Sequence, residues 1–235
     1  MSETTTALVT GANKGIGYEI AAGLGALGWR VGVGARDDTR RDEAVAKLQA
    51  AGVDAFGVPL DVTDDASVAA AAAQLDRLDV LVNNAGITGG GPQDPTTIDL
   101  DILRTVLETN VFGVIRTTNA MLPLLRRSAS PRIVTVSSTV GSLTRQAAGQ
   151  AGPIALGYSP SKTYLNAVTL QYVRELEGTD IKINLACPGY VATDLNGHSG
   201  HRTPQEGAAV AIRLATLPDD GPTGGFFDDA GPIPW

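Results

Sequence analysis

The chain has 235 residues, 43% of them hydrophobic, and a formal net charge of −7. This acidic balance argues against a nucleic-acid partner, which needs a clustered basic face, and no apolar stretch is long enough to span a bilayer. One cysteine, Cys187, excludes an internal disulfide, and its apolar surroundings predict a buried filler rather than a nucleophile. The start of the chain lacks the pattern of a signal peptide, so we expect a soluble cytoplasmic protein that forms a single domain over 1–235.

Short apolar runs alternate with helical patterns along the chain, which is typical of βαβ units and a parallel sheet. Most runs are continuously apolar, as expected when helices cover both faces of a sheet. We therefore predict an α/β, doubly wound (Rossmann) fold with a mostly parallel seven-stranded sheet and functional residues at the carboxyl ends of the strands. The strand candidates are residues 7–10, 30–35, 54–60, 78–83, 132–138 and 181–186, and a last one near 224–227.

A glycine-rich turn, "TGANKGIG" (Thr10 to Gly17), follows the first strand candidate. Glycine permits a tight turn and close approach of a pyrophosphate, and the start of the next helix supplies free N–H groups. The GxxxGxG spacing differs from the GxGxxG of the common dinucleotide fingerprint. It resembles the TGxxxGxG motif of the short-chain dehydrogenase/reductase family, and the resemblance extends from Ala7 to the end of the chain.

Two later motifs agree with that family. In "LDVTD", Asp61 and Val62 match the positions that contact the adenine, and "NNAG" follows the fourth strand candidate. The resemblance implies that Asn83 braces the sheet and that Ala85 and Gly86 lie beside the cofactor. Each motif alone also reads as ordinary turn residues.

The end of the second strand candidate, "ARDD", bears on the choice of dinucleotide. Ala35 stands where an acidic residue would repel a 2′-phosphate, and Arg36 and Lys14 can bind such a phosphate. Alternatively both are ordinary surface cations, and Asp37 and Asp38 weaken the local positive potential. We predict NADPH as cofactor and no metal.

The segment "YSPSK" matches the YxxxK motif of the family. The resemblance implies that Tyr158 protonates a carbonyl oxygen as hydride arrives, that Ser138 binds this oxygen, and that Lys162 binds the nicotinamide ribose. A phenol pKa near about 10 suits neutral pH poorly, so we predict that Lys162, four residues on, lowers the pKa of Tyr158. Pro160 predicts a helix that begins around 157–159 or is kinked there.

Asn110 completes the predicted catalytic set. It lies within a long helical pattern over 99–127, where asparagine is unfavourable and needs a hydrogen-bond partner when buried. A structural hydrogen bond would explain it. The family resemblance implies instead that Asn110 distorts the helix and holds a water that links to the lysine.

The sequence "CPGYVATDL" resembles the substrate region of the family, and the polar, glycine-bearing residues that follow predict a lid around 190–203. His198 and His201 lie there, where solvated histidines are commoner than catalytic or metal-bound ones. The long spacing between Ser138 and Tyr158 leaves a monomer and a homo-oligomer (dimer or tetramer) open. Apolar pocket walls, and with them an apolar carbonyl substrate, are predicted from Ile87, Leu143, Ile154, Leu156, Tyr190 and Leu195.

These motifs place the chain nearest to carbonyl-reductase-like members of the family. We predict an NADPH-dependent reductase of aldehydes or ketones, with a carrier-linked biosynthetic ketoreductase and a non-catalytic dinucleotide sensor as alternatives. The resemblance places the cofactor against Thr10, Gly11, Asn13, Lys14, Gly15, Ile16, Gly17, Arg36, Asp61, Val62, Asn83, Ala85, Gly86, Tyr158, Lys162, Pro188, Gly189, Val191 and Thr193.

Overall fold

The computed structural model describes residues 4–235 and contains an eight-stranded sheet of order β3-β2-β1-β4-β5-β6-β7-β8. Neighbouring strands are parallel except for the final pair, β7 and β8, which is antiparallel. The strands are β1 (Thr6–Thr10), β2 (Arg30–Ala35), β3 (Ala55–Pro59), β4 (Val80–Asn83), β5 (Arg132–Val136), β6 (Lys182–Ala186), β7 (Phe226–Asp228) and β8 (Gly231–Pro232).

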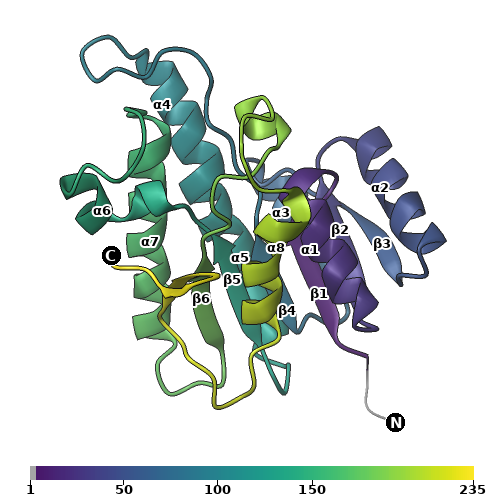
Figure 1. The fold of residues 1–235 in the computed structure, drawn as a ribbon. Helices are drawn as coiled ribbons and strands as arrows, with labels where there is room; N and C mark the ends of the chain where they lie inside the picture. The colour runs from purple at the N-terminus through teal and green to yellow at the C-terminus, as the bar shows by residue number, and fades with distance from the viewer. Residues whose placement is uncertain (1–3) are drawn as a thin grey trace.

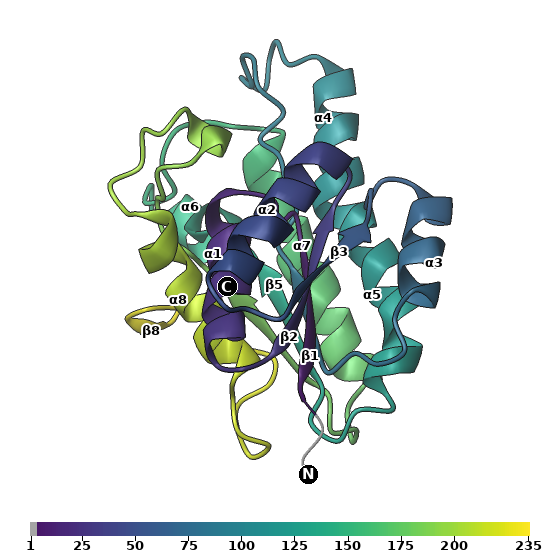
Figure 2. The same cartoon turned by 90° about the vertical axis from the view of Figure 1, so that its right-hand side faces the viewer.

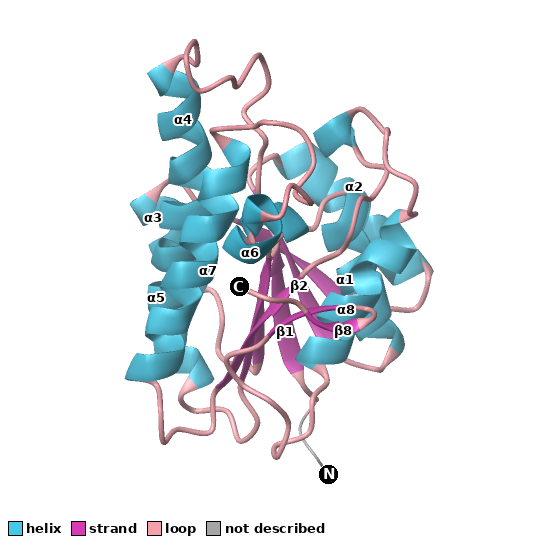
Figure 3. Ribbon diagram, turned by 60° about the vertical axis from the view of Figure 1, so that its left-hand side comes forward, coloured by secondary structure: helices cyan, strands magenta, loops and turns pink. Residues whose placement is uncertain are grey.

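Helices cover both faces of the sheet (Figures 1 and 3). On one face lie α1 (Gly15–Ala26), α2 (Asp38–Ala50) and α8 (Pro204–Ala215), as Figure 2 shows from the side of α2. On the other face lie α3 (Asp65–Ala73), α5 (Gly113–Leu125) and α7 (Tyr158–Glu175). The remaining helices are α4 (Leu100–Leu107), which precedes α5, and the short α6 (Leu143–Ala147).

Alternate residues of the central strand explain the two layers. In β1, Ala7 and Val9 enter the hydrophobic cluster under α1, α2 and α8, whereas Leu8 enters the cluster under α3, α5 and α7. Successive side chains of a strand point to opposite faces. Because both faces are covered, the three central residues of the strand are all apolar, and the predicted doubly wound α/β class is confirmed.

The eighth strand differs from the seven that the sequence predicts. The Asp228 carboxylate accepts hydrogen bonds from the N–H groups of Ala230 (2.9 Å) and Gly231 (3.1 Å), and this turn folds the chain back. Phe227 then pairs with Pro232. A two-residue strand that contains proline carries no recognisable strand pattern, so the sequence alone gave no signal for it.

The topology places a crevice at the carboxyl ends of the strands. β1 lies between β2 and β4, and the chain leaves these strands toward helices on opposite faces of the sheet, which is the switch point where doubly wound folds bind ligands. Cys187 is 1% exposed and unpaired, as predicted. Within residues 4–235, no helix combines the length and the apolar character needed to cross a membrane.

Candidate active site

The glycine turn after β1 leaves the start of α1 open. Gly11 and Gly15 have φ angles of 65° and 56°, in the left-handed region that favours glycine. Lys14, the N-cap residue of α1, makes no side-chain capping bond, and the first turn has no acidic residue. The free N–H groups and the helix dipole therefore suit an anion, and this arrangement fits the pyrophosphate of a nicotinamide dinucleotide.

The side-chain amide of Asn84 braces this turn, a role that the sequence motifs did not indicate. Asn84 Nδ2 donates to the carbonyl oxygens of Thr10 (2.9 Å) and Gly11 (3.3 Å). The Thr10 hydroxyl in turn accepts from the N–H groups of Asn84 and Ala85, each at 2.9 Å. Asn83 is buried and donates to Thr118 Oγ1 (3.0 Å), so its side chain points toward α5 rather than into the turn. The NNAG motif was the available signal for Asn84.

Arg36 lies exposed just after β2, at the predicted 2′-phosphate position. The two carboxylates that follow it are engaged elsewhere: Asp37 accepts from the Arg40 N–H at the start of α2 (3.0 Å), and Asp38 pairs with Arg41. Among the described residues, Arg36 itself forms no ion pair. Its guanidinium is therefore available to an anionic ligand.

Lys14 has a partner that the sequence did not indicate. Its Nζ lies 2.6 Å from Asp194 Oδ2, in the 190–203 segment, and both side chains are more than half exposed. Lys14 also borders an open hollow of about 270 Å³ beside the glycine turn, which Arg40 and Lys47 border as well. Three cationic side chains and the carboxylate of Glu43 thus border this hollow next to the start of α1.

Asp61 and Val62 follow β3. Burial alone would raise the pKa of the Asp61 carboxyl, but hydrogen bonds from the Thr63 N–H (2.9 Å) and hydroxyl (2.7 Å), together with the charges of Arg36 and Arg116, bring it below its ordinary value. Val62 is 8% exposed and belongs to the hydrophobic cluster under α3 and α5. Asp61 is therefore an ionised acceptor near Arg36.

Asn110 lies in a π-helical turn, Glu108–Phe112, between α4 and α5. It is fully buried; its Oδ1 accepts from the Ile87 N–H (2.8 Å), and its Nδ2 donates to the Ile87 carbonyl (2.9 Å) and to Ser161 Oγ (3.0 Å). The predicted helix distortion is confirmed, and the structural hydrogen bonds are present as well. The water link to Lys162 stays a prediction.

Tyr158 is the first residue of α7, so the interpretation that the helix begins around 157–159 is confirmed. Pro160 falls in the first turn, where its missing N–H breaks no helical bond. The Ser138 hydroxyl lies near the Tyr158 phenol and favours its ionised form. Lys162, 5% exposed, places Nζ 5.8 Å from the centre of the Tyr158 ring and donates to the Val136 carbonyl (2.9 Å).

The prediction that Lys162 lowers the pKa of Tyr158 is wrong for this structure. Burial raises the pKa of Tyr158 to about 12, although the nearby Ser138 hydroxyl opposes this rise. Burial also lowers the pKa of Lys162 to about 8. Loss of water disfavours both charged forms, and an ammonium 5.8 Å from the ring does not compensate for it. The sequence spacing gave the proximity of the two groups but not their desolvation.

The predicted lid folds back on itself. Val191 pairs with Arg202 in an isolated bridge, Asn196 Nδ2 donates to the Val191 carbonyl (2.9 Å), and the hydroxyls of Tyr190 and Ser199 are 2.6 Å apart. Its mobility stays a prediction.

Thr193 lies beside a neighbouring part of the chain, whereas His198 bonds within the segment. A methyl group built on Gly15 would lie 3.5 Å from Thr193 Cγ2, so Thr193 is beside the glycine turn. His198 is exposed and has its Nε2 2.9 Å from Asp194 Oδ1.

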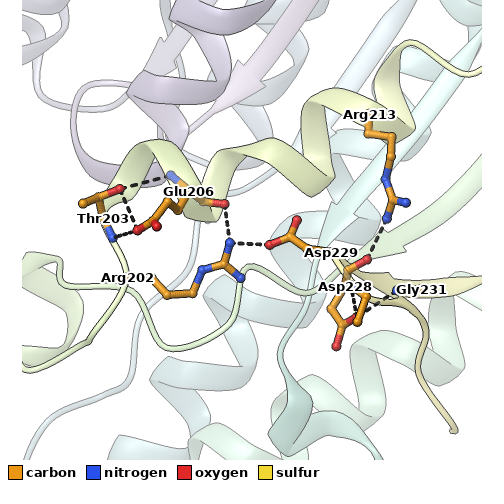
Figure 4. Close-up of polar contacts among 8 residues, drawn as sticks. Arg202, Thr203, Glu206, Arg213, Asp228, Asp229 and Gly231 are labelled. Carbon is orange, nitrogen blue, oxygen red and sulfur yellow. Dashed lines mark hydrogen bonds and ion pairs between the residues drawn. The ribbon is translucent and has the colours of Figure 1, made fainter.

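Arg202 ties the end of this segment to the turn between β7 and β8 (Figure 4). Its Nη2 donates to the Glu206 carbonyl (2.7 Å) and to the Asp229 carboxylate. Nearby, Arg213 donates to the Asp228 carbonyl (2.6 Å). Three segments that are separate in sequence therefore meet at this point.

The predicted pocket walls do not belong to the buried core. Leu143, Ile154, Tyr190 and Leu195 are between 41% and 70% exposed. Ile87 and Leu156 are half-buried. These apolar side chains are thus free to contact a ligand.

Comparisons with known proteins agree with the motifs. A family model described as short chain dehydrogenase matches residues 5–203. Short-chain dehydrogenase/reductase 1 of Saponaria officinalis is 36% identical, with 97% of this chain and 95% of that protein covered. A putative ketoacyl reductase of the monensin polyketide synthase of Streptomyces virginiae is 39% identical, with 83% and 73% covered. The structure of NADPH-bound carbonyl reductase from chicken fatty liver has a TM-score of 0.86 at 31% identity and covers 99% of this chain and 100% of that chain.

Proposed function

This chain belongs to the short chain dehydrogenase family, and on that premise we propose that it is an NADPH-dependent reductase of aldehydes or ketones. Its relatives support an oxidoreductase that acts on CH–OH or carbonyl groups with a nicotinamide dinucleotide. The observation that carries the proposal is that Ser138 lies close enough to the Tyr158 phenol to favour its ionised form, with Lys162 Nζ 5.8 Å from the centre of the phenol ring.

Ser138, Tyr158 and Lys162 have different roles at the carbonyl oxygen of the substrate. Bound NADPH supplies the hydride that adds to the carbonyl carbon. Ser138 and Tyr158 hold the oxygen between two hydroxyls, and Tyr158 donates its proton as negative charge develops there. Lys162 stabilises the phenolate that remains, because opposite charges at this distance attract. Asn110 holds the neighbouring Ile87 backbone in place and contacts Ser161 of α7.

The preference for NADPH rests on the end of β2. Ala35 carries no carboxylate to repel a 2′-phosphate, and Arg36 is exposed. Asp37 and Asp38 are engaged with α2, which removes the main objection to a phosphate beside Arg36. A guanidinium can bind phosphate through two parallel hydrogen bonds.

A carrier-linked ketoreductase is the second candidate, and the 39% identity to a putative polyketide ketoacyl reductase favours it. A carrier protein of acidic character would need a basic docking patch near the 190–203 segment. Arg202, the arginine of that segment, is engaged with Asp229 and the Glu206 carbonyl. A small apolar carbonyl fits better, because the predicted walls are exposed and uncharged.

The test is a panel of aldehydes, ketones and carrier-linked thioesters, followed by loss of NADPH absorbance with NADH in parallel. We expect reduction of free apolar carbonyls with NADPH as the better donor. Tyr158→Phe should bind NADPH normally and lose turnover by about 100-fold or more. A better rate with NADH, or a Tyr158→Phe variant with full activity, would contradict the proposal. A non-catalytic sensor would bind NADPH and reduce nothing on the panel.

A further inference from the structure

Helix α7, which carries Tyr158 and Lys162, begins without a capping side chain of its own. Its N-cap residue is Gly157, whereas α2, α3, α4 and α8 each begin with an aspartate or threonine whose side chain accepts a backbone N–H. Pro160 has no N–H, and the Ser159 N–H bonds to the Ala155 carbonyl (2.9 Å). The donors that still need a partner are therefore the N–H groups of Gly157 and Tyr158.

Gln93 supplies the missing cap from a distant part of the chain. Its Oε1 accepts from the N–H groups of Gly157 and Tyr158, each at 3.1 Å, and its backbone carbonyl accepts from the Leu156 N–H (3.0 Å). Three consecutive N–H groups thus end on one residue. The orientation of the amide is fixed, because backbone N–H groups can meet only its oxygen. Gln93 is 9% exposed.

The other end of the same amide holds the loop that follows β4. Gln93 Nε2 donates to the carbonyls of Thr88 (2.6 Å) and Gly90 (3.3 Å). This loop contains three consecutive glycines, Gly89 to Gly91, all with positive φ, and within the described chain residues 87–92 form no backbone–backbone hydrogen bond. Asn110 fixes the same loop at Ile87. The Gln93 side chain therefore joins a loop with little support of its own to the start of α7.

The packing around this contact is close. A methyl group built on Gly157 would lie 3.1 Å from Gln93 Oε1, and one built on Gly89 would lie 2.5 Å from Val106. The glycine at the start of α7 therefore lets the Gln93 amide reach the backbone.

We propose that Gln93 is a positioning residue for the reaction, because its side chain sets the first turn of α7 and with it the direction of the Tyr158 phenol toward Ser138. This inference rests on the proposed function. Misplacement of a catalytic group by about 1 Å can cost about 100-fold in rate. The role needs a donor and an acceptor on one side chain, which glutamine provides and methionine of similar length does not.

The experiment compares Gln93→Met, Gln93→Glu and the control Gln49→Met. Gln49 is also a glutamine bonded to a backbone carbonyl, that of Ala55 (2.8 Å), but it lies at the far end of α2. We expect Gln93→Met to lower kcat by about 10- to 100-fold while the Kd for NADPH stays within about twofold. Gln49→Met should leave both unchanged.

Gln93→Glu provides a conservative rescue with a pH signature. A neutral carboxyl can still accept from the start of α7 and donate to the Thr88 carbonyl, whereas an ionised carboxylate faces two carbonyl oxygens. Relative to the parent protein, this variant should therefore be most active at the acidic end of the pH range and lose activity as the pH rises. A Gln93→Glu variant no better than Gln93→Met at every pH would overturn the proposal.

Hydrogen exchange separates this proposal from the proposed function. In Gln93→Met, the amides of Gly157 and Tyr158 should exchange at least about tenfold faster than in the parent protein, because they lose their acceptor. Unchanged exchange would refute the positioning role even if the parent protein were active. Conversely, if exchange is faster in Gln93→Met but the parent protein reduces no carbonyl, the capping role of Gln93 stands and only the proposed function is refuted. A loss of kcat that Gln49→Met reproduces would also count against Gln93.

Discussion

Two polar clusters border the proposed catalytic site, and they are built from different groups. The buried cluster is largely neutral, and the side chains of Gln93, Asn110 and Ser161 each make several hydrogen bonds to backbone or to one another. Asn110 alone makes three, all away from water. The members of the buried cluster are Gln93, Asn110, Ser161 and Lys162, with the half-buried Tyr158 at its edge.

The surface cluster consists of charged or chargeable side chains in or beside the 190–203 segment. Lys14 and Asp194 form an ion pair in which both side chains are more than half exposed. The hydrogen bond and the charge of Lys14 lower the pKa of the Asp194 carboxyl, with His198 adding to the effect. The members are Lys14, Asp194, His198, Arg202 and Asp229.

This difference shows which groups of the proposed site are held in one arrangement and which are not. Buried polar groups without partners are costly, so a buried network has one favourable arrangement and fixes the groups to which we assign the chemistry. Exposed ion pairs contribute little and are screened by salt. The 190–203 segment, the predicted lid, is therefore held by contacts that can be broken at small cost.

The largest expected effect comes from Asn110→Leu, which breaks the buried cluster. It leaves the Ile87 N–H and carbonyl and the Ser161 hydroxyl without this partner, so we expect the free energy of unfolding to fall by about 3 kcal/mol and kcat by at least about tenfold. Chemical denaturation and steady-state kinetics measure both. Asn119→Leu is the control, because Asn119 is exposed and only accepts from Tyr172 (2.7 Å). Equal losses of stability and kcat in the two variants would contradict the distinction between the buried and the surface cluster.

The next effect is the pH dependence that Lys162 confers on stability. Its pKa is lowered to about 8 in the folded protein, against about 10.4 in an unfolded chain. Between these values the unfolded state binds more protons, so the stability of the parent protein should rise with pH by on the order of 2–3 kcal/mol relative to Lys162→Met. Tyr158, raised to about 12, acts in the opposite direction only above about pH 10. The free energy of unfolding is measured against pH for both proteins. Parallel curves for the parent and Lys162→Met from pH 8 to pH 10 would contradict a lowered pKa of Lys162 in the folded protein.

Arg202→Ala should have an intermediate effect. Arg202 is partly shielded and bonds both Asp229 and the Glu206 carbonyl, so we expect a loss of about 1 kcal/mol in the free energy of unfolding. Because the 190–203 segment loses its tie to the β7–β8 turn, KM for the carbonyl should rise more than kcat falls. Thermal unfolding and kinetics on the same preparation test this. A loss as large as that of Asn110→Leu would show that the surface cluster is not the weaker one.

Asp194→Asn is expected to have the smallest effect on stability, within about 0.5 kcal/mol and vanishing at high salt. It frees Lys14 from its ion pair, so NADPH should bind a few-fold more tightly at low ionic strength, because the freed ammonium faces the hollow beside the glycine turn. Equilibrium titration with NADPH at two salt concentrations measures the change. Weaker NADPH binding would mean that Asp194 orients Lys14 rather than competing for it.

Local patterns made most of the fold predictable. The continuously apolar runs identified seven of the eight strands, and Pro160 located the start of α7, because both depend on residues that are neighbours in sequence. The two-residue β8 was missed, since it depends on a turn made by the Asp228 carboxylate.

The sequence by itself determined the doubly wound fold, the glycine turn and the proximity of Tyr158 to Lys162, because backbone conformation and helical spacing are local properties. Only the tertiary structure decided which distant groups meet. The cap on Tyr158 comes from Gln93, 65 residues away, and the partner of Lys14 lies 180 residues away. It also decided the direction of the Tyr158 pKa, since that depends on how much water the folded chain excludes from the phenol.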